Sequence, residues 1–331
     1  MNILFRVDAG DKIGLGHYFR TITLAKALYK RGIGVTITHK PSPFWTKVVL
    51  PFPTVTLEEG KEESHTLQLI KKGDFSVYYV DGIIAFTEAF IESIRKSRIK
   101  VVFYQNNSDT KHLCDIFILP SLRYDSSFFK NFSEKTKVFT GLDYVIFNEK
   151  VYQLASKRKP IRKIAENIGI VTGGSDPKGV LLTIHSLIEH ATFQHINFIY
   201  FYGEDFLHKE NIPAHTKANV QFSPFDLKAV SNMDIVICTF GVSTYELMYL
   251  GIPTISIGHQ FTNAAASKKV ADCTKGIIDL GLIDDINATR LNDTLGMLID
   301  QPQQREALSK NAMKAIDAKG IDRIIQIVTS S

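Results

Sequence analysis

The sequence predicts an α/β protein built from two doubly wound domains. At 331 residues the chain is longer than one compact core usually holds, so two domains are expected. Short apolar runs alternate with segments whose apolar residues recur every three or four positions. This alternation is typical of βαβ units with a parallel sheet, and it occurs in two successive series separated by a charged stretch over residues 151–167.

The first series predicts an N-terminal domain over residues 1–155. Helical periodicity is expected at Arg20 to Lys30 and at Thr87 to Ser97, between strand-like runs. The predicted strands are Ile3 to Val7, Val35 to Thr38, Val77 to Val80, Val101 to Tyr104 and Ile116 to Leu119.

The second series predicts a C-terminal domain over residues 156–331. Its strand-like runs are Ile168 to Thr172, Asn197 to Phe201, Asn219 to Phe222, Ile235 to Cys238 and Thr254 to Ile257. Its expected helices are Lys178 to His190, Tyr245 to Leu250, Ala264 to Val270 and Gln304 to Ala318. Doubly wound sheets bind ligands beyond the carboxyl ends of their strands, so we expect the site in those loops, at a cleft between the halves.

Composition excludes several classes of function. The apolar fraction of 44% fits a folded globular protein, and no apolar run reaches the roughly 18 residues of a membrane span. The N-terminus does not read as a signal peptide, so a cytoplasmic location is expected. The net charge of +5 is mild, and without a basic face interleaved with aromatics nucleic-acid binding is not expected. The three widely spaced cysteines and the histidines between 185 and 195 lack metal-ligand spacing, so we expect no metal and no cofactor.

The stretch after the first strand contains Gly14, Gly16, His17 and Arg20. The glycines allow a tight turn, and the helix start that follows favours an anion. The dinucleotide pattern GxGxxG is incomplete because residue 19 is Phe19. His17 and Arg20 would share one face of the first helical turn, where one exchanges a proton near neutral pH and the other carries a fixed charge. The alternative is that His17 is a capping or partly buried residue.

A second strand-to-helix turn contains Gly173, Gly174, Ser175 and then Pro177 at a plausible first helical position. Exposed amides in such a turn would hold a diphosphate. An ordinary connection between a strand and a helix is the alternative.

A third turn contains Gly241, Ser243, Thr244 and Glu246 after the run Ile235 to Cys238. The two hydroxyls are suited to phosphate oxygens, and the carboxylate is suited to the two hydroxyls of a ribose. A carboxylate in the first turn of a helix also simply complements the helix dipole, which is the alternative for Glu246.

These motifs together resemble a known family. The elements are the N-terminal strand with GxGH-x-x-R, the GG-S-D turn, "STYELMYLGIPTISI", "HQFTNAAA" and the late "KGIDRI". In this order they resemble the UDP-sugar hydrolases of pseudaminic acid biosynthesis and the related spore-coat polysaccharide proteins. The resemblance runs from Asn2 to about Arg323. It implies the fold of GT-B glycosyltransferases, in which two Rossmann-like domains face each other across a cleft.

The resemblance also implies a mechanism. His17 would activate water against the anomeric carbon of a UDP-linked 2,4-diacetamido-2,4,6-trideoxy sugar, with inversion and loss of UDP. Helix N-termini would stabilise the leaving diphosphate without a metal. Arg20 would fix this arrangement or contact the substrate. The C-terminal domain would hold the nucleotide through Gly173, Gly174 and Ser175 near the sugar or diphosphate, Ser243 and Thr244 on phosphate, and Glu246 on the ribose.

The chain departs from the family pattern at several positions. Where the hydrolases tend to have Asp-His-Tyr, this chain has Asp81-Gly82-Ile83, which leaves the ligand of the attacking water in question. Asp81 itself matches the pattern, and the resemblance implies that it contacts the substrate. A polar loop that would reach the sugar reads His259-Gln260 where relatives often have Asn-Gln. Asn106-Asn107 and Asn148 also differ from the pattern. These changes suit a different sugar or an acceptor other than water, so a GT-B glycosyltransferase and a silent nucleotide-sugar-binding protein stay open as alternatives.

Overall fold

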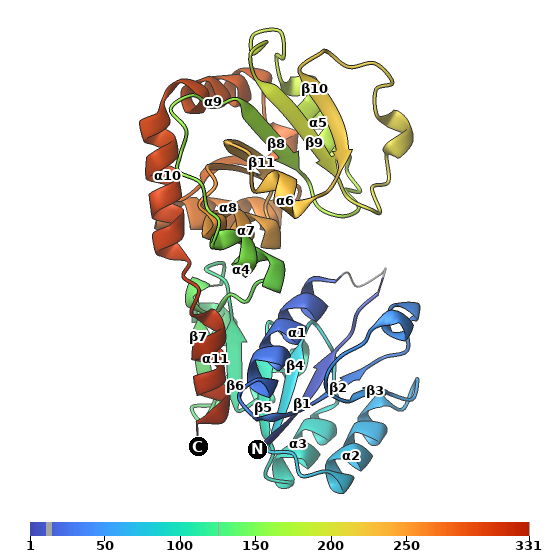
Figure 1. Ribbon diagram of the computed structural model, residues 1–331. Helices are drawn as coiled ribbons and strands as arrows, with labels where there is room; N and C mark the ends of the chain where they lie inside the picture. The colour runs from blue at the N-terminus through green and yellow to red at the C-terminus, as the bar shows by residue number, and fades with distance from the viewer. Residues whose placement is uncertain (11–14, 125, 331) are drawn as a thin grey trace. The chain divides into compact units, whose positions relative to one another are not determined.

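The computed structural model describes residues 1–10, 15–124 and 126–330. The chain divides into two compact units. The first contains Met1–Glu149 and the chain from Lys319 onward, and the second contains Lys150–Ala318. Each unit is a parallel sheet with helices on its faces, as the sequence predicts (Figure 1).

The first unit has a seven-stranded sheet in the order β3-β2-β1-β4-β5-β6-β7. Its strands are β1 (Asn2–Val7), β2 (Gly34–His39), β3 (Thr54–Thr56), β4 (Val77–Asp81), β5 (Lys100–Tyr104), β6 (Ile116–Leu119) and β7 (Lys137–Thr140). Its helices are α1 (Gly16–Tyr29), α2 (Glu62–Lys72), α3 (Glu88–Lys96) and α11 (Gly320–Thr329).

Both faces of this sheet are buried, because successive side chains of a strand point to opposite faces. In β1, Ile3 and Phe5 join a core cluster with residues of α1 and α11, whereas Leu4 joins a cluster with residues of α3. The strand order reverses between β1 and β4, which makes the carboxyl ends of these two strands the place where such a sheet binds ligands.

The units divide the chain differently from the predicted domains 1–155 and 156–331. Helix α4 (Glu149–Ala155) begins at the boundary, so the second unit starts six residues earlier than expected. Helix α11 belongs to the first unit, because Ile324, Ile325 and Val328 on its apolar face are buried in the core around β1. The sequence places α11 at the end of the second series, with nothing to show this return.

The second unit has a six-stranded sheet in the order β10-β9-β8-β11-β12-β13, which reverses between β8 and β11. Its strands are β8 (Asn167–Val171), β9 (Asn197–Tyr202), β10 (Val220–Pro224), β11 (Ile235–Thr239), β12 (Thr254–Gly258) and β13 (Ile278–Leu282). Its helices after α4 are α5 (Val180–Leu187), α6 (Leu227–Val230), α7 (Val242–Leu250), α8 (Phe261–Thr274), α9 (Ala288–Asp300) and α10 (Pro302–Ala315).

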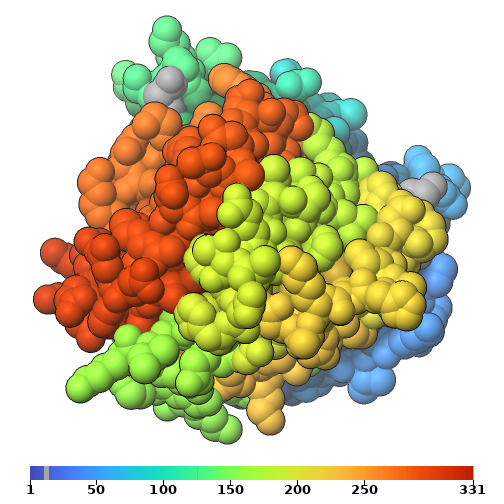
Figure 2. Space-filling view, turned by 90° about the horizontal axis from the view of Figure 1, so that it is seen from above, coloured from blue at the N-terminus to red at the C-terminus, as the bar shows by residue number. Residues whose placement is uncertain are grey.

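Helices α5 and α9 contact each other on one face of the second sheet, and their apolar residues share one core cluster with β8 and β9. Figure 2 shows the surface of this region, with the chain around α9 and α10 in orange to red beside the yellow-green chain around α5. Among the described residues, no helix has both the length and the apolar character needed to cross a membrane.

Candidate active site

The first unit brings His17 and Arg20 together with Asp81 at the carboxyl ends of β1 and β4. His17 lies in the first turn of α1, and its Nδ1 is 2.9 Å from Oδ1 of Asp81, the last residue of β4. The Arg20 guanidinium donates from Nε to both carboxylate oxygens, at 2.7 Å and 3.0 Å, and from Nη2 to Oδ1. Thr21 Oγ1 donates to Oδ2 at 2.9 Å. The predicted pair therefore lies on one face of α1, around a carboxylate from the neighbouring strand.

Asp81 is held in its ionised form. Its side chain is only 1% exposed, and burial alone would raise the pKa of this carboxyl. The charge of Arg20 and the hydrogen bonds from Arg20 and His17 outweigh burial, so the pKa of Asp81 lies below its ordinary value. Burial would lower the pKa of Arg20, but Asp81 raises it above its ordinary value. The pair is an ionised carboxylate and a charged guanidinium throughout the neutral range.

This carboxylate and Arg20 both contact Nδ1 of the His17 ring, at 2.9 Å from Oδ1 of Asp81 and 2.6 Å from Nη2 of Arg20. A proton on Nδ1 is donated to Asp81, whereas an unprotonated Nδ1 accepts from Arg20, which only donates. The first tautomer leaves the lone pair on Nε2, on a side chain that is 25% exposed. A histidine with this arrangement can accept a proton from a water or hydroxyl group.

Residues that sequence reasoning did not single out complete the arrangement. Gly82 has φ +113°, a backbone conformation that favours glycine, and a Cβ there would be in ordinary contact with His17 Nδ1 at 3.4 Å. Gln105 Oε1 accepts from Arg20 Nη1 at 2.6 Å, and the Tyr104 ring lies 4.9 Å from the guanidinium carbon. Of these residues, only Gly82 could have been noticed in the sequence, because a glycine directly after a strand is a sign of a tight turn.

Two of the predicted substrate contacts in this unit are engaged with neighbouring side chains. The oxygens of Asp81 accept from His17, Arg20 and Thr21, so Asp81 orients the His17 ring, and its expected contact with the substrate stays a prediction. Arg20 is bonded to Asp81, and its expected role in fixing the arrangement or contacting the substrate stays a prediction. Gly16 begins α1, and a side chain there would meet no atom within 4 Å, so sterics do not require glycine. Gly14 lies outside the described residues.

The second unit brings three of the predicted stretches to one cavity of ≈ 260 Å³. The loop after β8, with Gly173, Gly174 and Ser175, lines one part of it. The turn after β11, which includes residues 241–243, and His259 after β12 line the rest. The cavity lies at the carboxyl ends of β8 and β11, where the strand order reverses.

The N-terminus of α7 is the part of this cavity that is suited to an anion. Val242 and Ser243 form its first turn and line the cavity. Amides in a first turn have no intrahelical partner, and the helix dipole favours negative charge there. The Ser243 hydroxyl adds a donor at the same place, so the turn is suited to a phosphate group.

The turn after β8 differs from the prediction. Helix α5 begins at Val180 and not near Pro177, and Asp176 has a left-handed φ of +40°. The Asp176 carboxylate accepts from the amides of Val180 at 2.9 Å and Leu181 at 2.8 Å. The Asp176 side chain therefore caps the N-terminus of α5, and these two amides are not available to a diphosphate. Exposed Gly173, with φ +93°, and Gly174 remain as the cavity wall.

Thr244 is a structural residue and not an accessible phosphate contact. Its side chain is fully buried, at 0% exposure. Its Oγ1 accepts from the Gly241 amide at 3.2 Å and lies 3.4 Å from Cys238 Sγ. The hydroxyl that was expected to bind phosphate instead holds the turn in which Gly241 lies.

Glu246 and Gln260 do not line the cavity. Glu246 lies further along α7, where burial raises its pKa to about 7, and no hydrogen bond or ion pair to its carboxylate is found within the described ranges. A half-buried carboxylate with such a pKa is a candidate for ligand binding. Gln260 is exposed at the N-terminus of α8. His259 lines the cavity, and its pKa is lowered by burial against the opposing effect of Asp176.

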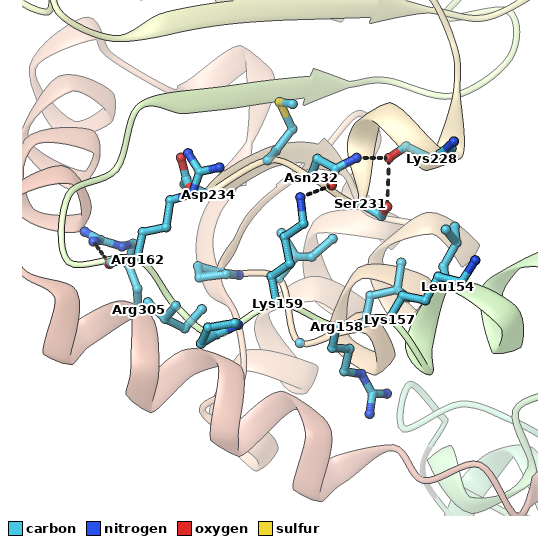
Figure 3. A pocket seen from close by; sticks show the side chains of 17 residues that line it. Leu154, Lys157, Arg158, Lys159, Arg162, Lys228, Ser231, Asn232, Asp234 and Arg305 are labelled. Carbon is cyan, nitrogen blue, oxygen red and sulfur yellow. Dashed lines mark hydrogen bonds and ion pairs between the residues drawn. The ribbon is translucent and has the colours of Figure 1, made fainter.

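The basic segment around Lys159 lies elsewhere in the second unit. It lines a pocket of ≈ 200 Å³ beside the segments that precede β11 and β12 (Figure 3). Lys159 donates to Asn232 Oδ1 at 2.7 Å, and Arg162 pairs with Glu166 at 2.9 Å. The labelled cations point in different directions and do not converge on one point. Across the part of the chain that the structure describes, no group of three or more histidine, cysteine or acidic residues is placed to hold a metal ion.

Comparison with known proteins agrees with the motifs. No family model matches the chain. The chain is 22% identical over 340 residues to the spore coat polysaccharide biosynthesis protein SpsG of Bacillus subtilis, covering 99% of this chain and 98% of that one. It is also 26% identical over 190 residues to the UDP-2,4-diacetamido-2,4,6-trideoxy-beta-L-altropyranose hydrolase of Campylobacter jejuni, covering 56% of this chain and 65% of the hydrolase. The predicted family resemblance is confirmed.

Solved structures show the same fold. MurG of Acinetobacter baumannii aligns with a TM-score of 0.66 at 15% identity, covering 99% of both chains. The UDP-GlcNAc 2-epimerase of Neisseria meningitidis, solved with UDP-GlcNAc bound, aligns with a TM-score of 0.66 at 13% identity, covering 98% of this chain and 99% of the epimerase. These matches confirm the predicted GT-B fold of two Rossmann-like units.

Proposed function

We propose that the protein cleaves a nucleotide sugar at its anomeric carbon, with His17 as the base and water as the nucleophile. The names of the relatives support this: one is a hydrolase of a UDP-linked diacetamido sugar, and another acts in polysaccharide biosynthesis. We take a UDP-linked 2,4-diacetamido-2,4,6-trideoxy sugar, or a close relative of it, as the substrate.

The observation that carries the proposal is the pairing of His17 with Asp81. A carboxylate that binds Nδ1–H orients the imidazole and stabilises the imidazolium that forms when Nε2 takes a proton. In the proposed step the water oxygen bonds to the anomeric carbon while the bond from that carbon to the diphosphate oxygen breaks. The proton goes to Nε2 of His17, the electron pair leaves with the diphosphate, and the configuration inverts.

The second unit supplies the contacts to the nucleotide in this proposal. The N-terminus of α7, with Ser243, would hold the diphosphate and stabilise the charge that develops on it. Gly173 and Gly174 would border the sugar or diphosphate, and Glu246 would accept from the ribose hydroxyls. No metal is assigned a role in this proposal.

Transfer to a carbohydrate hydroxyl is the second candidate. It needs the same base and the same nucleotide contacts, and it is favoured by a cavity of ≈ 630 Å³ in the first unit that the segment after Asp81 helps to line. The third candidate is a protein that binds a nucleotide sugar without turning it over.

A panel of sugar nucleotides, scored for free nucleotide with and without carbohydrate acceptors, tests the proposal. Each reaction is run with and without a chelator. Release in buffer alone is expected for hydrolysis, and release only with an acceptor indicates transfer. Tight binding with no release under any condition would contradict an enzymatic function, and loss of release with the chelator would contradict the metal-free step.

A further inference from the structure

One hydrogen-bonded group of side chains, the Asp81 cluster, is formed by His17, Arg20, Thr21, Asp81 and Gln105. Both oxygens of its carboxylate accept, and each nitrogen of its guanidinium has a partner inside the cluster. The hydroxyl of Thr21 and Nδ1 of His17 are bonded as well. Within the described residues, two polar side-chain atoms of the cluster have no hydrogen bond, and these are Nε2 of His17 and Nε2 of Gln105. These two atoms are left to bind a ligand.

The amide of Gln105 has a fixed orientation. Within the described residues its side chain makes one hydrogen bond, in which Nη1 of Arg20 donates to Oε1 at 2.6 Å. Because a guanidinium only donates, the amide oxygen must face Arg20, and the NH₂ group lies at the other end of the amide. Nε2 has no partner there and is not buried, so it is open to solvent. Gln105 thus presents an N–H donor that the chain itself leaves unused.

The guanidinium of Arg20 holds the imidazole and the amide next to each other. Nη2 lies 2.6 Å from Nδ1 of His17, and Nη1 lies 2.6 Å from Oε1 of Gln105. Both Nη atoms are bonded to one carbon, so the two side chains meet at the same end of Arg20. With the ring proton on Nδ1, Nε2 of His17 accepts a hydrogen bond, whereas Nε2 of Gln105 donates one. A water molecule donates and accepts, so it matches this pair of atoms.

The backbone of Gln105 is unusual for a residue with a side chain. Its φ is +53°, in the left-handed region that favours glycine. Gln105 directly follows β5, and its backbone amide donates to the carbonyl of Ile118 at 2.8 Å, which fixes this position. Residues other than glycine in such conformations carry a conformational cost and are concentrated at functional sites. The conformation therefore supports a functional role for the Gln105 side chain.

The residues next to this position offer no comparable donor. Gly82, which lies beside the His17 ring, has no side chain, and Ile83 after it is apolar. The NH₂ groups of Asn106 and Asn107 already donate to other groups of the chain. Among these neighbours, a water beside His17 would find its side-chain donor in Gln105.

We propose that Gln105 binds and positions the water that attacks the anomeric carbon. The inference rests on the proposed cleavage of a nucleotide sugar with His17 as the base. The water oxygen accepts from Nε2 of Gln105, and one of its O–H groups donates to Nε2 of His17, which leaves a lone pair for the new bond. As the oxygen bonds to the anomeric carbon, the proton moves to His17, and the diphosphate leaves with the electron pair of the broken bond. The amide is neutral, so it orients the oxygen without adding charge.

The test uses two variants at residue 105 and one matched control. Gln105→Met removes the amide from a side chain of similar length. Gln105→Gly removes the whole side chain at a left-handed position that suits glycine, so this variant is expected to fold. Thr21→Val is the control, because it also removes one hydrogen bond from the Asp81 cluster, but at a residue that is only 1% exposed. Nucleotide release from the best sugar nucleotide is measured on the full chain over a pH series, with melting temperatures for each variant.

Both variants at residue 105 should lower the maximal rate at least about tenfold, with unchanged KM and an unchanged midpoint of the pH profile, and Thr21→Val should lower it less. A smaller loss overturns the inference while the proposed cleavage stands. A moved midpoint also overturns it, because a residue that acts only through Arg20 and Asp81 would change how the base titrates. An equal loss in Thr21→Val overturns it as well, since the loss would then follow from the whole cluster. No release by the wild type contradicts the proposed cleavage itself, and the inference falls with it.

Discussion

Asp81 Oδ1 lies 2.9 Å from His17 Nδ1, on a carboxylate that also accepts from Arg20 and Thr21. The two residues are 64 positions apart and meet because β1 and β4 are neighbours in the sheet. The pairing links the fold to the proposed chemistry, since the strand order places the carboxylate beside the helix that carries His17, the proposed base.

The Asp81→Asn variant tests this pairing. An amide has one accepting oxygen and an NH₂ group in place of the second oxygen, so it cannot accept from His17, Arg20 and Thr21 together, and turnover should fall about 10²- to 10⁴-fold with little change in nucleotide affinity. Steady-state kinetics and calorimetric binding check this. Thr21→Val, which removes one hydrogen bond to the carboxylate and costs about 1 kcal/mol of stability, should lower turnover less than about tenfold. Equal turnover of Asp81→Asn and wild type would contradict the role of Asp81.

Adjacent hydroxyls of α7 should behave differently. Ser243→Ala removes a donor from the cavity, so nucleotide affinity should fall about tenfold with unchanged stability. Thr244→Val leaves the Gly241 amide unpaired, so the free energy of unfolding should fall by about 1–3 kcal/mol. Calorimetric titration and urea unfolding separate the two effects. The reverse pattern would show that Thr244 is the phosphate contact.

The wall of the cavity at the ends of β8 and β11 depends on a close backbone approach at Gly203. A Cβ at this position would lie 2.1 Å from the carbonyl oxygen of Gly174. Gly203→Ala should displace the Gly174 loop, lower the free energy of unfolding by about 1–3 kcal/mol and weaken nucleotide binding. Gly174→Ala, whose Cβ would meet nothing within 4 Å, is the control for stability and should change it by less than about 0.5 kcal/mol. Equal stability of both variants would contradict this packing.

Glu246 predicts a pH dependence of nucleotide binding. Burial raises its pKa to about 7, so the carboxylate is largely protonated at pH 6 and ionised at pH 8. If the ionised form accepts from the ribose, the affinity for a nucleotide sugar rises with pH across this range. Glu246→Gln should abolish the rise, and Glu210→Gln at an exposed site should preserve it. Titration calorimetry at pH 6, 7 and 8 measures the slope, and a flat wild-type profile would contradict the assignment.

The raised pKa of Glu246 also makes stability depend on pH, and stability should fall with rising pH whereas nucleotide affinity should rise. A carboxyl whose pKa is raised in the folded state binds more protons there than in the unfolded chain between its ordinary pKa of 4.5 and about 7. The contribution of Glu246 to the free energy of unfolding is therefore present below pH 4.5 and is lost as the pH rises to about 7. Nucleotide binding should restore stability at the higher pH.

The sequence predicts the central strands well and the edges poorly. The central strands are apolar along their whole length because both faces are buried, and this pattern is visible in any window of the chain. The strands β3 and β7 lack this continuous apolar pattern, because they lie at sheet edges and most of their residues are exposed. They are therefore absent from the strands predicted from the sequence. Helix α11 shows an apolar face in the sequence, but the core that covers this face is set by the whole topology.

Site residues follow the same division. The glycine turns and His17 are local signals, and the sequence locates them because strand-to-helix turns are short. The partners are set over long distances: Asp81 meets α1 only through strand pairing, and Gly203 meets Gly174 from another loop. The roles of Thr244 and Asp176 could not be predicted from residue type. A hydroxyl or carboxylate beside a helix start can bind a ligand or a backbone amide, and here both side chains accept from backbone amides.

Nucleotide release by His17→Ala tests the central claim most directly. Removing the base should lower turnover at least about 10³-fold while the affinity for the nucleotide sugar stays within about twofold of wild type. The rate is measured with the best sugar nucleotide of the panel, in buffer and with acceptor, on variants whose melting temperatures match the wild type. Loss of release with retained binding is the predicted result, and wild-type release by His17→Ala would contradict the account.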